Sequence, residues 1–116
     1  QALSRQISNL YTEEDGYLYV VTLDPQLEDT LSQNLESSDQ GNYLSLEPAQ
    51  AQNIIDKIAN QVQTLVQQGH LPVLLTAPML RRPLKELTYR TLKELIALSY
   101  NELDSQIDIQ VIGTVR

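Results

Sequence analysis

Short apolar runs alternate with amphipathic stretches along this chain, a pattern that predicts strands separated by helices. The run 17–23 is rich in β-branched and aromatic residues, and Asp24 and Pro25 follow it as a helix N-cap and a first helical residue. Leucines then recur every four residues from Leu27 to Leu35, which gives that helix a narrow apolar stripe. We therefore expect a strand that leads directly into a helix.

The middle of the chain continues this alternation. A polar loop is expected at 37–42, and the segment 43–46 is a candidate for a short edge strand. A long amphipathic stretch over about residues 48–68 predicts a second helix, for which Gly69 is a natural C-terminal stop. The apolar run 73–75 then predicts a strand that is covered on both faces and therefore central in its sheet.

A basic helix follows, with Leu80, Leu84, Leu87, Thr91 and Leu95 at helical spacing and its charged residues on the opposite face. Pro83 complicates this helix, because a proline in a helix interior loses a hydrogen bond and clashes, at ~3 kcal/mol or more. We expect a short turn at 78–82 and a regular helix that begins at Pro83.

Strands at 96–99 and 107–115 complete the pattern, so the element order is β-α-(β)-α-β-α-β-β. Strands separated by helices imply a small, mostly parallel sheet with helices packed on it, which is an α/β fold. The connection through Asp104, Ser105 and Gln106 is short and contains no helix. For that reason we expect the last strand to be antiparallel.

The first residues of the chain differ from the rest. Leu3, Ile7 and Leu10 have helical spacing, which indicates the end of an amphipathic helix whose main body lies upstream. A charged connector then ends at Gly16. We interpret residues 1–16 as the end of a preceding helix with its connector, and residues 17–116 as a single α/β domain, for which this length and 41% hydrophobic residues suffice.

The charge distribution is uneven, and for the acidic domain as a whole it favours a basic or mixed-charge protein partner. The net charge is −7, yet five of the eight basic residues lie between positions 79 and 95, where only Glu86 and Glu94 oppose them. Nucleic acid is a poor partner for so acidic a domain. Arg81 and Arg82 stand at a helix start, where cations oppose the helix dipole, so an acidic group is expected nearby. It belongs either to an internal ion pair or to a bound anion or acidic partner.

The residues offer little for catalysis. There is no cysteine, no glycine-rich phosphate loop and a single histidine, His70, to which we assign a structural role. Asp24 follows the first strand, where α/β folds often place functional groups, so a small enzyme or a phosphoacceptor module is an alternative to its role as a helix cap. Acidic clusters at 13–15 and 28–29 lack metal-ligand spacing and are interpreted as solvated. We predict neither enzyme activity, nor a cofactor, nor a metal.

Several segments in a fixed order carry a resemblance to a known family. They are Leu18–Glu28 (LYVVTLDPQLE), Pro72–Thr76 (PVLLT), Leu80–Arg82 (LRR), Leu98–Leu103 (LSYNEL) and Ile112–Val115 (IGTV), and the opening Ala2–Ile7 (ALSRQI) fits as well. Together they resemble the end of the FlhA/InvA/SctV (FHIPEP) family, the export-gate proteins of flagellar and virulence type III secretion systems. Departures are Ala77 in place of a frequent serine, Pro83 within a usually continuous helix, and Glu94 in place of a common proline.

The resemblance implies the last of four soluble subdomains in a membrane protein, at the cytoplasmic face of the bacterial inner membrane. Family members are not enzymes. They form a nonameric ring that receives chaperones and secretion substrates, and the last subdomain is thought to meet the stalk of the export ATPase. The resemblance does not separate a flagellar system from an injectisome, and a stand-alone interaction domain is a third interpretation. We expect the fragment alone to be monomeric. The partner-contact candidates are Arg81, Arg82, Lys85, Glu13, Glu14 and Asp15.

Overall fold

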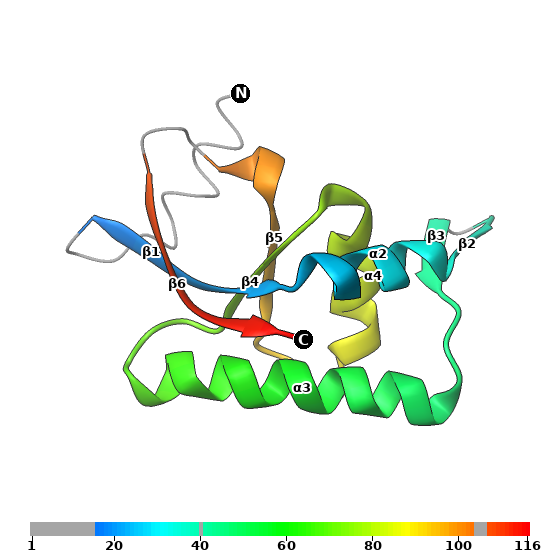
Figure 1. Cartoon of the computed structure of the whole chain (residues 1–116), viewed down its shortest axis with the longest axis horizontal. Coiled ribbons are helices and arrows are strands. Elements are labelled where there is room, and N and C mark those ends of the chain that lie inside the picture. The colour runs from blue at the N-terminus through cyan, green and yellow to red at the C-terminus, as the bar shows by residue number, and fades with distance from the viewer. Residues whose placement is uncertain (1–15, 40, 104–106) are drawn as a thin grey trace.

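A four-stranded parallel sheet forms the centre of the computed structural model, which describes residues 16–39, 41–103 and 107–116. The strands are β1 (Tyr17–Leu23), β4 (Val73–Thr76), β5 (Ile96–Ser99) and β6 (Asp108–Val115). Their order is β5-β4-β1-β6, and each neighbouring pair is parallel (Figure 1). The predicted α/β class, the order of elements and the central position of the strand at 73–76 are confirmed.

Three helices are present in the described part of the chain: α2 (Pro25–Gln33), α3 (Pro48–Gln67) and α4 (Pro78–Thr88). Their apolar side chains pack with one face of the sheet into the larger hydrophobic cluster. Its buried members are Val21, Leu23, Leu31, Ile54, Ile58, Val62, Leu65, Leu74, Leu80, Leu84, Leu95 and Val115. None of these three helices is long and apolar enough to cross a membrane.

The opposite face of the sheet carries a second hydrophobic cluster made of strand residues. Its buried members are Leu18, Val20, Val73, Leu75 and Leu98. Alternation along β1 separates the two clusters, because successive side chains of a strand point to opposite faces: Leu18 and Val20 join the second cluster, whereas Val21 and Leu23 join the first. The run 73–75 of β4, which predicted a doubly covered central strand, is divided in the same way, because Leu74 joins the first cluster and Val73 and Leu75 join the second.

The last strand is parallel, so the prediction of an antiparallel strand is wrong. β6 does not pair with β5; it lies at the other edge of the sheet, where Tyr17 to Leu23 of β1 pair with Asp108 to Val115. A short connection forces an antiparallel arrangement only when it joins adjacent strands as a hairpin. Here residues 100–107 connect the two opposite edges, and that argument does not apply.

Helix α4 begins at Pro78 and continues through Pro83, so the predicted turn at 78–82 is also wrong. Leu80 and Leu84 are both fully buried, and burial of such side chains contributes roughly 1.5–3 kcal/mol each. That gain offsets the ~3 kcal/mol cost of an internal proline. The helix ends at Thr88 instead of extending to Leu95, and residues 89–95 form turns.

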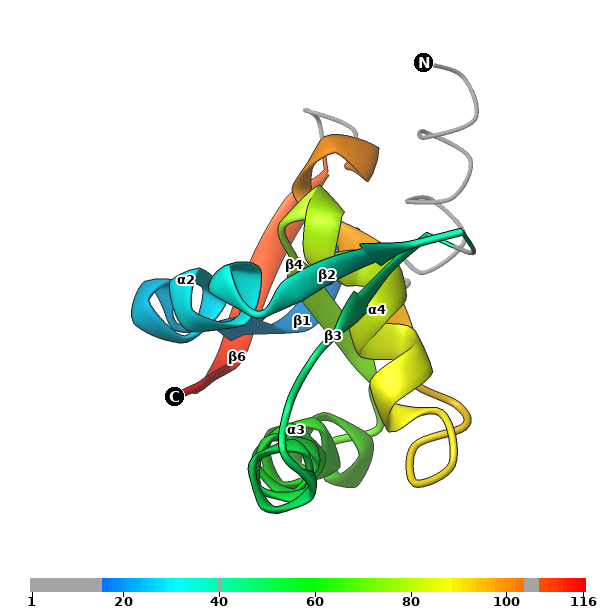
Figure 2. The same cartoon turned by 90° about the vertical axis from the view of Figure 1, so that its right-hand side faces the viewer.

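The polar loop expected at 37–42 lies within a β-hairpin, and the short strand expected at 43–46 is found at 41–44. Strands β2 (Leu35–Ser38) and β3 (Gly41–Leu44) pair antiparallel, and the hairpin lies across α4 (Figure 2). Leu35, the last residue of the predicted apolar stripe of the first helix, is the first residue of β2, because α2 ends at Gln33. The hairpin places polar residues beside the helix that carries the predicted arginine pair.

Candidate protein-contact site at the edge of β5

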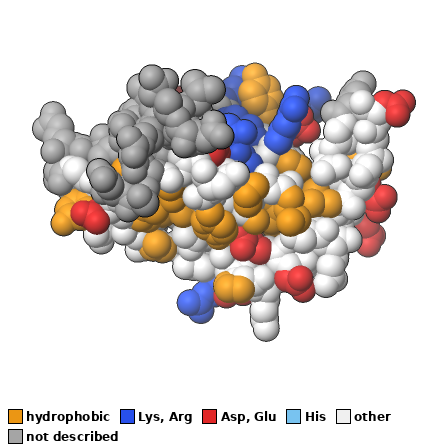
Figure 3. Space-filling model, turned by 90° about the horizontal axis from the view of Figure 1, so that it is seen from above, with side chains coloured by type: hydrophobic (Ala, Val, Ile, Leu, Met, Phe, Trp, Pro, Cys, Tyr) orange, Lys and Arg blue, Asp and Glu red, His pale blue; other side chains and the backbone are white. Residues whose placement is uncertain are grey.

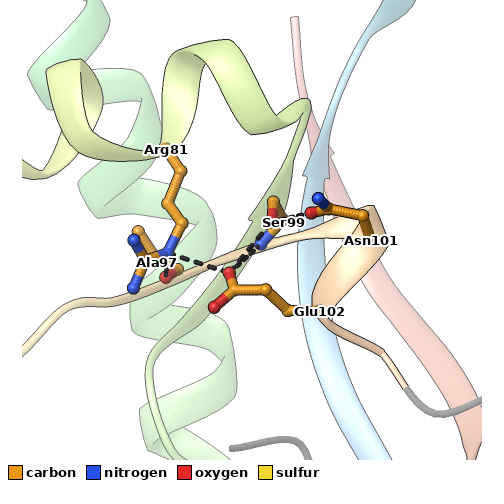
Figure 4. A network of polar contacts seen from close by, with 5 residues as sticks. All are labelled: Arg81, Ala97, Ser99, Asn101 and Glu102. Atoms are coloured by element: carbon orange, nitrogen blue, oxygen red, sulfur yellow. Dashed lines mark hydrogen bonds and ion pairs between the residues drawn. The ribbon is translucent and has the colours of Figure 1, made fainter. Parts of the chain in front are cut away.

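Arg81 reaches from α4 to the outer edge of the sheet. Its Nε lies 2.9 Å from Oε1 of Glu102 and donates a hydrogen bond of 3.1 Å to the carbonyl oxygen of Ala97 (Figure 4). The Arg81 side chain is 44% exposed and that of Glu102 only 15%. Of the two interpretations of the arginine pair, the internal ion pair is therefore confirmed for Arg81.

Glu102 organises the end of β5. Its Oε1 accepts hydrogen bonds of 2.9 Å from both the backbone N–H and the hydroxyl of Ser99, while Asn101 Oδ1 accepts a second, short bond from that hydroxyl (Figure 4). The bond from the Ser99 N–H, together with a bond from the Glu102 N–H to the Ser99 side chain, forms the capping box of a short 3-10 helix, η1 (Tyr100–Glu102). Sequence reasoning did not single out Glu102, although a serine followed three residues later by a glutamate is the signature of this box.

Lys85 and Arg82 differ from Arg81 and from each other. Lys85 Nζ donates a short hydrogen bond to the carbonyl oxygen of Leu95 and one of 3.2 Å to that of Lys93. Arg82 is 80% exposed, and its Nε lies 3.7 Å from the 60% exposed carboxylate of Glu86. Surface pairs of this kind contribute little to stability. Of the three basic contact candidates, Arg82 is thus the one whose charge is most available to a partner.

A hollow of about 640 Å³ follows this edge and is lined by Arg81, Arg82, Lys85 and residues 94–98. Seen from above, Lys and Arg side chains gather over α4 beside a band of hydrophobic side chains (Figure 3). The three predicted basic candidates are thus brought together. The three acidic candidates, Glu13, Glu14 and Asp15, lie outside the described residues.

Glu28 is a further charged residue whose role the sequence did not reveal. From α2, its Oε2 accepts hydrogen bonds from the Ala77 N–H (2.9 Å), the Thr76 hydroxyl (3.3 Å) and the Tyr100 hydroxyl (3.0 Å). Ala77 is the N-cap residue of α4, so a negative charge meets the positive end of that helix dipole. Glu28 is therefore not simply solvated, as its cluster was interpreted.

The hydrogen bond to Glu28 also changes the chemistry of Tyr100. Partial burial, and next the bond to the Glu28 carboxylate and its negative charge, raise the pKa of Tyr100 from 10.0 to about 12. The hydroxyl is therefore protonated at neutral pH and acts as a donor. This tyrosine is not activated as a base or nucleophile.

The other candidates for chemistry have structural roles. Asp24 caps α2 by accepting a 3.1 Å hydrogen bond from the Gln26 N–H, which confirms the cap interpretation. The His70 ring stacks on Tyr19 with 3.9 Å between ring centroids and 12° between planes. Within the described ranges, no group of three or more His, Cys, Asp or Glu residues is arranged to hold a metal ion. What the geometry offers is a basic sheet edge able to contact another protein.

Comparison with known proteins assigns the chain to a family. The family model described as the FHIPEP family matches residues 1–108. The chain belongs to the FHIPEP family. The flagellar biosynthesis protein FlhA of Bacillus subtilis (strain 168) is 35% identical over 115 residues, which cover 99% of this chain and 17% of that protein. The low calcium response locus protein D of Yersinia pestis is 29% identical over 114 residues, 98% of this chain and 16% of that protein.

Solved structures of FHIPEP relatives share the fold. The Chlamydia pneumoniae CdsV protein superimposes with a TM-score of 0.84 at 28% identity over 99% of this chain and 33% of that one. The nonameric SctV-C of EPEC, solved by cryo-EM, gives 0.81 at 27% identity over 98% of this chain and 34% of that one. The chain thus spans about a sixth of the length of these two relatives and about a third of these two structures.

Proposed function

We propose that this chain is the last cytoplasmic subdomain of an export-gate protein in a type III protein secretion apparatus, and that it acts as a non-enzymatic module that binds other proteins. The observation that carries this proposal is the FHIPEP match over residues 1–108, together with a fold likeness that covers 98–99% of the chain. Residues 17–116 would be the subdomain, and residues 1–16 its connector to the preceding one. Its location would be the cytoplasmic face of the bacterial inner membrane.

The partners that we propose are copies of the same subunit in a nonameric ring, the stalk of the export ATPase, chaperones and secretion substrates. A nonameric relative with this fold supports the ring. A complex of CdsV with CdsO from Chlamydia pneumoniae, whose CdsV superimposes with a TM-score of 0.83 at 28% identity, supports a protein partner. The basic hollow beside β5 is suited to an acidic surface on such a partner.

The three basic contact candidates divide into two groups. Arg81 and Lys85 hold the edge of β5 through side-chain hydrogen bonds, so their replacement would change both the fold and a contact. Arg82 forms an exposed ion pair with Glu86, which contributes little to stability. Replacement of Arg82 therefore tests a contact with a partner with little effect on the fold. Glu13, Glu14 and Asp15 remain candidates from the sequence.

A secretion assay tests the proposal in the full-length protein. Deletion of residues 17–116 should abolish export of substrates into the medium, and the intact gene should restore it. The Arg82→Glu variant should reduce export several-fold while the purified cytoplasmic region still forms rings in electron micrographs. Lys57→Glu, with the same charge change on an exposed position of α3, should leave export unchanged.

Two results would contradict different parts of this proposal. Normal export without residues 17–116 would overturn the secretion role. Normal export with Arg82→Glu would overturn the contact assignment alone.

A further inference from the structure

The outer side of β5 presents backbone N–H and C=O groups at the spacing needed to pair with one more strand. In a parallel strand, alternate residues direct their N–H and C=O groups to opposite sides. The Ile96 N–H donates to the Pro72 carbonyl on the β4 side at 2.8 Å, so Leu95, Ala97 and Ser99 direct theirs away from the sheet. Among the strands of the described residues, β5 is the last on this side. We call these three outward-facing residues the β5 edge.

Side chains form hydrogen bonds with three backbone groups of the β5 edge. Lys85 donates to the Leu95 carbonyl, Arg81 donates to the Ala97 carbonyl, and Glu102 accepts from the Ser99 N–H. Two donors and one acceptor at every second residue are what a neighbouring strand would offer. The edge is therefore satisfied by groups that a backbone could replace one for one.

The side chains that line the hollow beside this edge determine what kind of segment would fit. The lining contains three basic side chains, Arg81, Arg82 and Lys85, and one acidic side chain, Glu94. Arg81 also pairs with Glu102 and Arg82 with Glu86, neither of which belongs to that lining. Arg81 and Arg82 are 44% and 80% exposed, so their charged groups can exchange partners without leaving water. A segment that displaced Arg81 and Lys85 from the carbonyls would meet their charges directly, which favours carboxylates on that segment.

We propose that the β5 edge binds an extended, acidic segment of a partner protein, which adds a strand to the sheet beside β5. Its backbone N–H groups bind the Leu95 and Ala97 carbonyls, and a backbone carbonyl of the segment takes the Ser99 N–H. Arg81 and Lys85 then pair with carboxylates of the segment. In the absence of a partner, the same two side chains cover the edge. This inference rests on the part of the proposed function that assigns a protein partner.

A peptide titration of the 116-residue chain tests the proposal. The probe is a heptapeptide with blocked ends that alternates valine and glutamate, followed by amide NMR of the chain. We expect the largest shifts at Ala97 and Ser99, and weaker binding as salt is raised, because charge contributes to the contact. Two matched peptides, one with lysine for glutamate and one N-methylated on alternate residues, should not bind.

Several results would overturn the proposal: no binding of the valine–glutamate peptide, equal binding of the lysine or N-methylated peptide, or shifts confined to β6. None of these would affect the proposed export role, because the secretion assay measures that role separately.

Variants of the chain sharpen the test. Lys85→Glu should weaken binding of the acidic peptide about tenfold or more, because it replaces an attractive charge in the hollow with a repulsive one. Lys57→Glu on α3 has the same charge change away from the hollow and should bind within about twofold of the unchanged chain. If circular dichroism shows that Lys85→Glu does not fold, Arg82→Glu replaces it. Equal binding by the folded hollow variant and the Lys57→Glu control would overturn the proposal.

Discussion

The two edges of the sheet are protected in different ways. β5 is four residues long and straight in register with β4, and charged side chains from α4 and η1 occupy its outer groups. β6 is eight residues long, and its register with β1 shifts between Val20 and Val21, which marks a bulge. Open strand edges invite pairing with other chains, and both charges and bulges are known means to prevent it.

The difference has a consequence for partners. A bulge distorts the backbone permanently, so another strand cannot pair with it evenly. Charged side chains on a regular edge can move away and leave a straight template. The protection of β5 is therefore reversible, whereas that of β6 is a fixed feature of its backbone. For this reason our proposal places the strand of a partner at β5 and not at β6.

The largest expected effect on the free energy of unfolding comes from shortening a buried side chain in one edge strand, compared with an exposed one in the other. Leu98 in β5 is 2% exposed, and we expect Leu98→Ala to lower the free energy of unfolding by about 3 kcal/mol. Val111 in β6 is 54% exposed, and Val111→Ala should change it by only about 0.5 kcal/mol. Urea denaturation measures both. Equal losses would mean that the β6 edge is as firmly packed as β5 and that the comparison fails.

Removal of the charge that organises the β5 edge should come next. Glu102→Gln leaves Arg81 without its carboxylate and weakens the bonds to Ser99, and we expect a loss of about 2 kcal/mol in the free energy of unfolding. Glu86→Gln is the matched control, since it removes an exposed pair with Arg82 and should cost about 0.5 kcal/mol or less. A loss no greater than that of the control would show that side chains do not stabilise this edge.

A smaller effect is expected where Glu28 binds the residues that follow β4 and β5. Glu28→Gln should lower the free energy of unfolding by about 1 kcal/mol and lower the pKa of Tyr100, while burial keeps that pKa above 10.0. NMR titration of labelled tyrosine rings, with Tyr100→Phe to assign the signal, measures the pKa. An unchanged value would show that burial alone raises it.

The raised pKa of Tyr100 also fixes the sign of a pH dependence. Its folded-state pKa of about 12 lies above the ordinary 10.0, so its contribution to stability is fully present below pH 10 and is lost as pH rises toward 12. Comparing Tyr100→Phe with the unchanged chain over this range isolates that contribution. The opposite slope would contradict the hydrogen bond to Glu28.

The smallest effect is expected on the β6 side. A Cβ at Gly113 would lie 2.2 Å from Oε1 of Gln61 on α3, but that atom is the far end of a flexible side chain and can turn away. Gly113→Ala should therefore change the free energy of unfolding by about 0.5 kcal/mol or less, as thermal denaturation would show. A larger loss that Gln61→Ala removes would indicate that the contact of α3 with β6 is rigid.

Local patterns in the sequence predicted much of this fold. The β-branched run before Asp24 and Pro25, the amphipathic stretch that ends before Gly69, and the apolar run at 73–75 all form the expected elements. These predictions depend on residues that are close in sequence. The direction of β6 and the continuity of α4 through Pro83 depend instead on contacts between residues far apart in the sequence. The spacing of apolar residues does not reveal such contacts.

The basic residues of the candidate site could be predicted from the sequence, but the carboxylates that they and α4 contact could not. Clustered basic residues at a helix start correctly indicated an acidic neighbour. Which carboxylate it was could not be predicted, because Glu102 approaches Arg81 only through the turn after β5, and Glu28 reaches Ala77 only when α2 packs beside α4. The proposed role of the β5 edge depends on β5 being an edge strand. The strand order determines this, and it could not be predicted from the sequence.

The hydrogen bonds of Glu28 also have a consequence for folding kinetics. They join residues that are 48, 49 and 72 positions apart, so they can form only after the intervening loops have closed. Interactions of this kind are expected to be absent from the folding transition state. Loss of the Glu28 carboxylate should thus accelerate unfolding and leave the folding rate nearly unchanged. One carboxylate on α2 would then lengthen the lifetime of the folded state without changing how fast that state forms.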